Sequence, residues 1–278
     1  MKLLRYGSAG AEKPGISDGN GTIRDLSGKV ADVGPDLLAD LDQLAGLDVG
    51  SLPVVEGSPR LGPCVAGTRK LIGIGLNYSD HAAESGLDVP PEPVVFMKAT
   101  SCIVGPNDTI EIPRDSAKTD WEVELGIVIG KGGKYIEEAN ALDAVAGYCV
   151  VNDVSEREFQ IERAGGWDKG KSADTFGPLG PWMVTRDEVA DPQKLSLWLE
   201  VNGRRFQDGN TDKMVYGVAF IVSYLSKFMR LEPGDVICTG TPPGVGMGQN
   251  PQVYLKPGDV VELGIEGLGS QRQNVVQG

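Results

Sequence analysis

Short apolar runs separated by turn residues recur through the later two-thirds of the chain and predict a β-rich fold. The runs expected to form strands are 70–75, 94–98, 121–129, 146–151, 195–201, 236–239 and 260–265. Apolar residues recur instead at helical spacing in 36–47 and 212–229, which predicts two helices. A further short helix is expected to begin at Ser79 or Asp80 and to end at Gly86. Ser155 and Glu158 have the spacing of a capping box, so another helix is expected to start there.

A Pro- and Gly-rich stretch at 53–67 divides the chain into two expected domains. Residues 1–66 are predicted to form a small β-rich N-terminal domain that contains the helix 36–47, and residues 67–278 a larger domain. The sequence Leu-Glu-Pro-Gly-Asp-Val-Ile at 231–237 recurs as Leu-Lys-Pro-Gly-Asp-Val-Val at 255–261. Pro-Gly at a turn centre favours a type II turn. Both copies are therefore predicted to be turns that lead into hairpin strands, and not units of a repeat protein.

The composition excludes several classes of partner. A net charge of -13 argues against nucleic acid and anionic membrane surfaces, because phosphate binding requires clustered Lys and Arg. No apolar run approaches the roughly 20 residues of a membrane-spanning helix. The 4 cysteines form no C-x-x-C pair, which predicts reduced core thiols in a cytoplasmic protein.

Three carboxylates form the first candidate site. Glu122 and Glu124 alternate with apolar residues in the strand 121–129, so both project from one face, about 7 Å apart. A solvated strand face is one interpretation, but the strand continues into Ile-Val-Ile and is expected to be central. Asp153 ends another apolar strand and would complete a set of three oxygen ligands, which suits Mg²⁺. With 1 histidine in the chain, a nitrogen-rich site is not expected.

His81 and Glu84 form the second candidate. They are three residues apart and share one face of the predicted helix that begins at Ser79 or Asp80. A carboxylate that orients an imidazole is the arrangement of a general base. A chance pair on a surface helix explains the same spacing equally well.

Three glycine-containing motifs suggest nucleotide or ligand binding. The segment 165–172, Gly-Gly-Trp-Asp-Lys-Gly-Lys-Ser, fits the phosphate-loop pattern, but a helix is expected before it and the Gly/Pro-rich segment 176–181 follows it. The segment 73–78, Gly-Ile-Gly-Leu-Asn-Tyr, lacks the third glycine of a dinucleotide fingerprint. Both nucleotide sites are therefore rejected. The loop 239–246 either offers backbone N–H groups to a ligand or is a structural turn.

Taken in order, these segments resemble the fumarylacetoacetate hydrolase family. The matching segments are Gly75-Leu76-Asn77-Tyr78 with His81 and Glu84, Phe96-Met97-Lys98, Asp120 to Leu125, Asn152-Asp153-Val154-Ser155 with Arg157 and Gln160, Gly170-Lys171-Ser172, Asn202-Gly203 with Gln207, Pro233-Gly234-Asp235, and Thr239-Gly240-Thr241-Pro242. They extend over residues 70–265. Within the family, the chain looks most similar to 2,4-diketo-3-deoxy-L-rhamnonate or fuconate hydrolases and to acylpyruvate hydrolases.

The resemblance implies a mixed α/β, β-rich fold, a β-sandwich roll with a small N-terminal domain, that forms a homodimer and binds Mg²⁺ or Mn²⁺. It implies that Glu122, Glu124 and Asp153 are the metal ligands. It also implies that His81 and Glu84 lie on a segment that closes over the substrate and activates water.

The same resemblance implies further contacts to a small diketo-acid substrate. Lys171 corresponds to a lysine beside the substrate's oxygens, and Arg157, Gln160 and Thr241 correspond to substrate-contacting positions. The expected reaction is metal-dependent hydrolytic cleavage of a C–C bond in a 2,4-diketo acid, such as L-2,4-diketo-3-deoxyrhamnonate, to pyruvate and a small carboxylic acid. Oxaloacetate decarboxylation, ureidoglycolate lyase activity and a non-enzymatic member of the fold are the alternatives.

Overall fold

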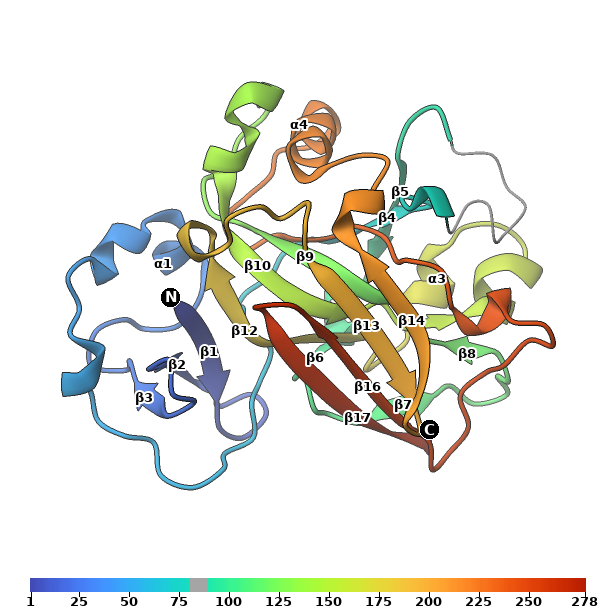
Figure 1. Cartoon of the computed structure of the whole chain (residues 1–278), viewed down its shortest axis with the longest axis horizontal. Coiled ribbons are helices and arrows are strands. Elements are labelled where there is room, and N and C mark those ends of the chain that lie inside the picture. Colours follow the sequence, from blue (N-terminus) through green and yellow to red (C-terminus); the bar gives the residue numbers. More distant parts are fainter. Residues whose placement is uncertain (81–89) are drawn as a thin grey trace.

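Two β-sheets form the body of the protein, which is described by a computed structural model for residues 1–80 and 90–278 (Figure 1). The main sheet runs in the order β3-β2-β1-β12-β10-β9-β15-β4-β5, and β6 pairs with β12. The bounds of these strands are β1 Lys2–Tyr6, β2 Lys13–Ser17, β3 Ile23–Asp25, β4 Leu71–Gly75, β5 Val94–Lys98, β6 Ile103–Val104, β9 Val123–Ile129, β10 Val145–Asn152, β12 Gly177–Thr185 and β15 Val236–Cys238. All residues of β9 and β10 are buried, because both strands lie in the middle of this sheet.

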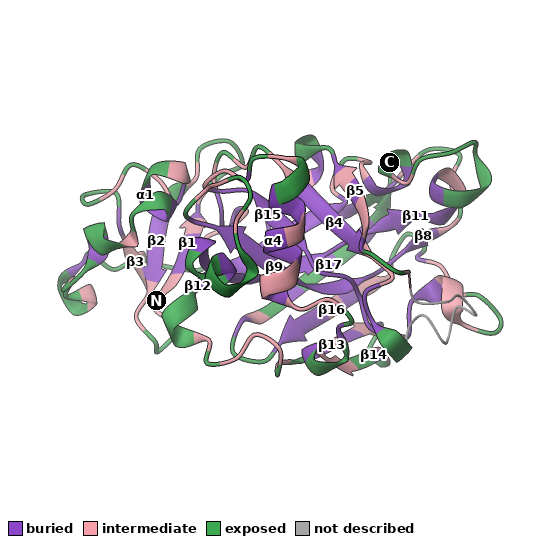
Figure 2. Cartoon of the chain, turned by 90° about the horizontal axis from the view of Figure 1, so that it is seen from above, coloured by how far each residue is buried: buried purple, intermediate pink, exposed green. Residues whose placement is uncertain are grey.

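A second sheet packs across the first, in the order β14-β13-β16-β17-β7. Its strands are β7 Ile110–Ile112, β13 Ser196–Val201, β14 Arg204–Asn210, β16 Val260–Ile265 and β17 Gly269–Gln277. β13 and β16 contact β9, while β16 and β17 contact β10, so the core lies between the two sheets. Figure 2 shows this buried interior flanked by exposed loops and short helices. The predicted β-rich fold class is confirmed.

Helices are few and mostly short. α4 Val218–Phe228 buries Val218, Ile221, Val222 and Leu225, and it packs against the 3-10 helix Glu138–Ala144. The helix predicted at 212–229 therefore forms from Val218 on, and a 3-10 turn, Thr211–Lys213, comes before it. No helix of the described residues is long and apolar enough to cross a membrane.

The helix predicted at 36–47 is interrupted. α1 Pro35–Ala39 is followed by the 3-10 helix Leu41–Leu44, because Asp40 has φ -147° and ψ 80°, outside the helical region. A further 3-10 turn, Val49–Ser51, follows. β1 pairs with β12, so the N-terminal strands extend the main sheet. The division into domains 1–66 and 67–278 stays a prediction.

The helix predicted from the capping box at Ser155 and Glu158 does not start at Ser155, and only a single helical turn forms after Arg157. Ser155–Glu156 forms β11, which pairs with β8 Thr119–Asp120. The Ser155 hydroxyl donates to the carbonyl oxygen of Asp153 instead of capping a helix. A single π-helical turn, Glu158–Glu162, follows, and then α3 Asp168–Lys171. Residues 155 and 156 therefore pair as a strand, where the local pattern predicted the first turn of a helix.

The two Leu-x-Pro-Gly-Asp segments form the same turn in different surroundings. Gly234 has φ 85° and Gly258 φ 96°, the conformation that a type II turn needs at its third residue. In each turn the N–H of the aspartate, Asp235 or Asp259, donates to the carbonyl three residues earlier. The second turn leads into the β16–β17 hairpin, as predicted. The first leads into β15, which is parallel to β4, so its predicted hairpin is wrong.

Candidate active site

Three buried carboxylates meet where β9 begins and β10 ends. Glu124 lies in β9, Glu122 just before it and Asp153 just after β10, and Val151 of β10 pairs with Glu124. Ligand atoms of the three side chains all lie within 4.8 Å of one another. The structure therefore brings together the three residues that the sequence singled out, and the alternative of a solvated strand face does not describe them. Their role as metal ligands stays a prediction.

Two buried lysines pair with the carboxylates, and one of them bridges two. Lys171, at the end of α3, places Nζ 2.6 Å from Glu122 Oε2 and 2.8 Å from Asp153 Oδ2. Lys98, at the end of β5, forms an ion pair with the other oxygen of Asp153 and donates to the carbonyl of Val154. Sequence reasoning assigned no role to Lys98. Its only local signal is a charge that closes an otherwise apolar strand run.

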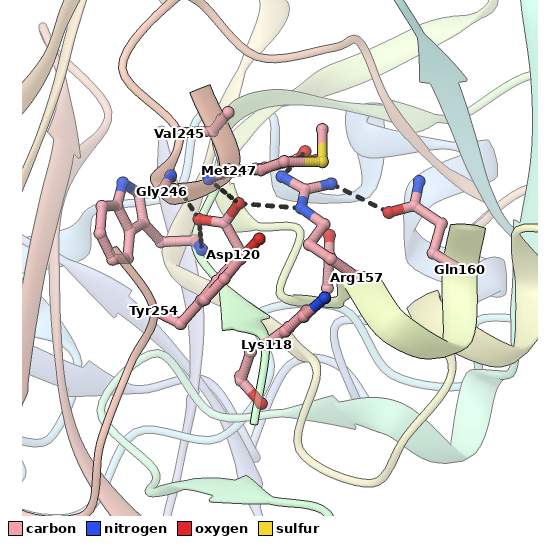
Figure 3. A network of polar contacts seen from close by, with 12 residues as sticks. Lys118, Asp120, Arg157, Gln160, Val245, Gly246, Met247 and Tyr254 are labelled. Carbon is pink, nitrogen blue, oxygen red and sulfur yellow. Dashed lines mark hydrogen bonds and ion pairs between the residues drawn. The ribbon is translucent and has the colours of Figure 1, made fainter. Parts of the chain in front are cut away.

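Arg157 connects the carboxylates to the substrate-contacting candidates (Figure 3). Its Nη2 donates to Glu122 Oε1 at 2.7 Å, and its Nη1 donates to Gln160 Oε1 at 3.0 Å. Its Nε donates to Asp120 Oδ2 at 2.8 Å. These bonds use three of the five guanidinium N–H groups. Arg157 thus orients Glu122 and still has donors for an anionic ligand.

Asp120 is a second residue to which the sequence assigned no role. This fully buried carboxylate accepts from the backbone N–H groups of Trp121, Gly246 and Met247 as well as from Arg157. The dashed lines in Figure 3 converge on it from the loop around Gly246 and from the guanidinium. Four donors saturate a carboxylate. Asp120 therefore joins the start of β9, the π-helical turn and the loop 244–248.

Two buried amides hold the backbone beside the carboxylates. Asn152 accepts from the N–H of Glu122 at 3.2 Å, and Gln207 accepts from the N–H of Val123 at 3.0 Å. Gln207 Nε2 also donates to Thr241 Oγ1, whose own hydroxyl donates to the carbonyl of Val123. The hydroxyl of Thr241 is thus largely engaged within the protein. Only the assembled sheets reveal these contacts.

The surroundings shift the pKa values of the two glutamates in opposite directions. Burial opposes ionisation of Glu122, yet the adjacent Lys171 and Arg157 hold its pKa well below the usual range. Burial raises the pKa of Glu124 well above the usual range, and the charges of Asp153 and Glu122 add to the shift. The backbone N–H of Gly240 donates to Glu124 Oε2 at 2.7 Å. Within the described residues no cationic side chain pairs with Glu124.

The charges of this cluster suit a divalent cation. Asp120, Glu122, Glu124 and Asp153 are buried beside three buried cationic side chains, those of Lys98, Arg157 and Lys171. Among the described residues the ionised form of Glu124 would lack a cationic partner, and unpaired charge is costly in an interior. The donor set is all oxygen, which hard cations such as Mg²⁺ and Mn²⁺ prefer. The residues present fit the metal that the sequence predicted.

A pocket of about 390 Å³ opens over the cluster. It is lined by Ile74, Gly75, Leu76, Phe96, Glu122, Glu124, Arg157, Gln160, Ile161, Trp167, Lys171, Gly240, Thr241, Met247, Gly248 and Gln252. Lys171, predicted to be catalytic, and the three predicted substrate-contacting residues, Arg157, Gln160 and Thr241, all belong to this lining. His81 and Glu84, and most of the helix predicted around them, lie outside the described residues.

The phosphate-loop pattern at 165–172 has the surroundings that argued against it. The π-helical turn precedes it, the strand β12 follows it, and α3 within it is a single short turn. Its lysine, Lys171, binds carboxylates of the chain itself. The loop after β15 faces the pocket in part, because Gly240 and Thr241 line it, and its binding to a ligand stays a prediction.

Comparison with known proteins agrees with this site. The profile of the family described as "Fumarylacetoacetate (FAA) hydrolase C-terminal" matches residues 70–276. A Burkholderia multivorans protein, named only provisionally as a hydrolase, is 66% identical over 276 residues, which is 98% of each chain.

Solved structures resemble the whole chain. The fumarylacetoacetate hydrolase from Exiguobacterium antarcticum has a TM-score of 0.89 and 36% identity, with 100% of both chains covered. A 5-carboxymethyl-2-hydroxymuconate delta-isomerase from Mycobacterium smegmatis has a TM-score of 0.77 and 33% identity over 100% of this chain and 99% of the other. The maleylpyruvate hydrolase from Sphingobium sp. SYK-6, solved with manganese(II) and pyruvate, has a TM-score of 0.83 and 28% identity, with 100% of both chains covered. With a buried carboxylate cluster under a pocket, this fold, and a family match over nearly all of residues 70–278, the chain belongs to the fumarylacetoacetate hydrolase family.

Proposed function

We propose that this protein is a metal-dependent hydrolase that cleaves a C–C bond of a 2,4-diketo acid and releases pyruvate and a carboxylic acid. The observation that carries the proposal is the buried cluster of Glu122, Glu124 and Asp153 with Lys171 beside it, at the base of a pocket of about 390 Å³. The pyruvate and manganese(II) bound by the related maleylpyruvate hydrolase support both product and metal.

Glu122, Glu124 and Asp153 would hold Mg²⁺ or Mn²⁺. When bound, such a cation supplies Lewis-acid polarisation of a keto oxygen and a positive charge for an anionic product. The chain's own residues do the remaining work. Their side chains are placed by strands and hydrogen bonds, so they need little rearrangement during the reaction.

Lys171 is placed to meet developing negative charge. Two of its three ammonium N–H groups are directed to Glu122 and Asp153, which leaves a third for the substrate. Burial alone would lower the pKa of Lys171, but Asp153 and Glu122 raise it, so the side chain stays cationic. The oxygen on C2 gains charge as the C3–C4 bond breaks and pyruvate departs as its enolate. Lys171 would stabilise that charge.

Arg157 and Gln160 would orient the carboxylate at C1. Arg157 retains two N–H groups after its bonds to Asp120, Glu122 and Gln160. A guanidinium and a carboxylate match as a bidentate pair. Thr241 would contribute mainly shape, because its hydroxyl already binds the backbone and Gln207.

His81 and Glu84 are proposed to activate the water that attacks C4, on the strength of the family resemblance. His81→Ala and Glu84→Ala are each expected to lower hydrolysis by about 10²–10⁴-fold, the usual contribution of a positioned acid–base group. Both variants should bind Mn²⁺ normally in calorimetry. Near-normal hydrolysis in both would refute this assignment.

Isomerisation is a second candidate, favoured by the similarity to the delta-isomerase from Mycobacterium smegmatis. It uses the same enolate-stabilising residues but needs no attack by water. Oxaloacetate decarboxylation shares this feature, and lyase action on ureidoglycolate would release urea. Decarboxylation needs no attack by water, so it should survive the loss of His81 or Glu84 better than hydrolysis does, and the products separate the other reactions.

The test is a pyruvate-release assay with Mn²⁺ over 2,4-diketo acids, oxaloacetate and ureidoglycolate, together with spectroscopic detection of keto–enol isomerisation. Pyruvate and a carboxylic acid in equal amounts from a diketo acid are expected. Turnover that survives exhaustive chelation, or no turnover of any diketo acid, would refute the proposal.

A further inference from the structure

Two aromatic rings extend the pocket outward from Lys171. Its Nζ lies 5.0 Å from the centroid of the Phe96 ring, and the Phe96 and Trp167 rings lie 5.5 Å apart at 52°. Exposure increases along this row, from 2% for Lys171 and 7% for Phe96 to a half-buried Trp167. The rings therefore lead from the charged base of the pocket towards its mouth.

Glycines on β4 create the space for both rings. Gly73 pairs with Phe96 across β4 and β5, and Gly73 and Gly75 share one face of the sheet. A Cβ at Gly73 would lie 2.1 Å from the ring of Phe96, and one at Gly75 would lie 2.4 Å from the ring of Trp167. The Gly-Ile-Gly segment, which is not a dinucleotide fingerprint, thus leaves room for the rings of Phe96 and Trp167. These two rings are called the aromatic wall below.

Hydrogen bonds hold this wall in place before any ligand arrives. Asp168 accepts from the N–H of Met97 at 2.9 Å, and Ser172 accepts from the N–H of Ala99 at 2.8 Å. Both bonds tie α3 and its flanks to the end of β5. Trp167, which directly precedes Asp168, is therefore preorganised against the strand.

The remaining lining separates into a polar and an apolar part. The charged side chains Glu122, Glu124, Arg157 and Lys171 belong to the base, where Glu122 pairs with Arg157 and Lys171 and Glu124 accepts from the N–H of Gly240. The apolar members are Ile74, Leu76, Phe96, Ile161, Trp167 and Met247. Among the described lining residues, Gln252 is an exposed polar side chain. Its Nε2 donates to the carbonyl of Met247 and not to the charged base.

We propose that the aromatic wall of Phe96 and Trp167 selects 2,4-diketo acids whose acyl group at C4 is apolar and bulky. This inference rests on the proposed function, because it assumes that the diketo end lies at the carboxylates and Lys171. The acyl group then lies along the rings, where contact removes apolar surface from water. A hydroxylated sugar-acid tail would give up hydrogen bonds to water there without regaining them.

The experiment compares three substrates by pyruvate release with Mn²⁺. They are acetylpyruvate, 5-methyl-2,4-dioxohexanoate and 5-hydroxy-2,4-dioxohexanoate, of which the last two differ by a methyl in place of a hydroxyl. The wild type is expected to show kcat/KM about 10- to 100-fold higher for the methyl compound than for the hydroxyl compound, the range for such a pair in an apolar pocket.

Variants then test the assignment to the wall. Trp167→Ala should remove most of the preference for the methyl compound over the hydroxyl compound, and kcat/KM for acetylpyruvate is the reference for any general loss of activity. Trp167→Phe should retain part of the preference for the methyl compound. Ile161→Gln alters a side chain that is 56% exposed and carries little risk to folding, and it should weaken the preference too. Trp198→Ala, a half-buried tryptophan on β13 outside the pocket, is the matched control and should preserve the wild-type ratio.

The outcomes separate this inference from the proposed function. If the wild type cleaves none of the three acids, the proposed function is wrong and the inference falls with it. If acetylpyruvate is cleaved but kcat/KM for the hydroxyl compound equals or exceeds that for the methyl compound, the inference alone is wrong. It is also wrong if Trp167→Ala lowers kcat/KM for all three acids by the same factor.

Discussion

At the scale of single residues, Lys171 combines structural contacts with a proposed chemical role. It is 2% exposed and lies between Glu122 and Asp153, so its charge offsets theirs. Lys171 also lines the pocket, with its Nζ 5.0 Å from the centroid of the Phe96 ring. The sequence 165–172 matches the phosphate-loop letters, but the expected neighbouring elements argue against that site, and the contacts of Lys171 are with carboxylates of the chain itself.

Lys171→Met is therefore expected to lower kcat by about 10²–10³-fold, the usual cost of removing one donor to a developing oxyanion. Mn²⁺ affinity measured by calorimetry should persist, because all three carboxylates remain. The matched control is Lys169→Met, which removes an exposed lysine whose Nζ donates to the carbonyl of Ala164. Calorimetry of the wild type should show no binding of ATP. Micromolar ATP binding that Lys171→Met abolishes, with hydrolysis intact, would reverse the assignment.

At the scale of elements, Asp120 fastens three segments that are distant in sequence. It ends β8, receives Arg157 from the segment between β11 and the π-helical turn, and accepts the N–H groups of Gly246 and Met247. These segments carry Glu122 and part of the pocket lining. The position of Glu122 thus depends on packing that Asp120 maintains through Arg157.

Asp120→Ala is expected to destabilise the fold by about 3–5 kcal/mol, because Arg157 would keep a buried charge with one carboxylate partner fewer. Urea unfolding followed by far-UV circular dichroism measures this loss. Asp208→Ala removes an exposed carboxylate on β14 and should change stability by no more than about 0.5 kcal/mol. Equal stability of the two variants would show that Asp120 does not fasten these elements.

At the scale of the whole molecule, the proposed metal site couples ligand binding to folding. Its three carboxylates lie in or directly beside two neighbouring strands and converge only when the main sheet has formed. Mn²⁺ at about 100 times its dissociation constant should therefore stabilise the wild type by about 2.7 kcal/mol. Thermal unfolding with and without Mn²⁺ measures the effect, and Glu124→Gln is expected to abolish it. An unfolding midpoint that Mn²⁺ leaves unchanged would contradict the site, whatever the activity.

The homodimer stays a prediction based on the family resemblance. Sedimentation equilibrium should give about twice the chain mass of 29.4 kDa. A single species of monomer mass at micromolar concentration would contradict it.

Much of the secondary structure and the centre of the site could be predicted from local pattern. The predicted strands 94–98 and 260–265 have the observed bounds of β5 and β16. Period-two alternation placed Glu122 and Glu124 on one face, and the apolar run after them placed that strand in the interior. Such features depend on near neighbours in the chain, so the sequence determined them by itself.

Tertiary structure alone decided how those faces meet and what accompanies the carboxylates. Lys98 pairs with Asp153 across 55 residues, and Arg157 pairs with Asp120 across 37. Ser155 joins a strand although its local pattern is that of a helix cap, because pairing with Asp120 is available only in the folded sheet. The rings of Phe96 and Trp167 likewise pack over Gly73 and Gly75 only when β4, β5 and α3 come together. Local periodicity determines which way a side chain points, whereas register and packing determine what it touches.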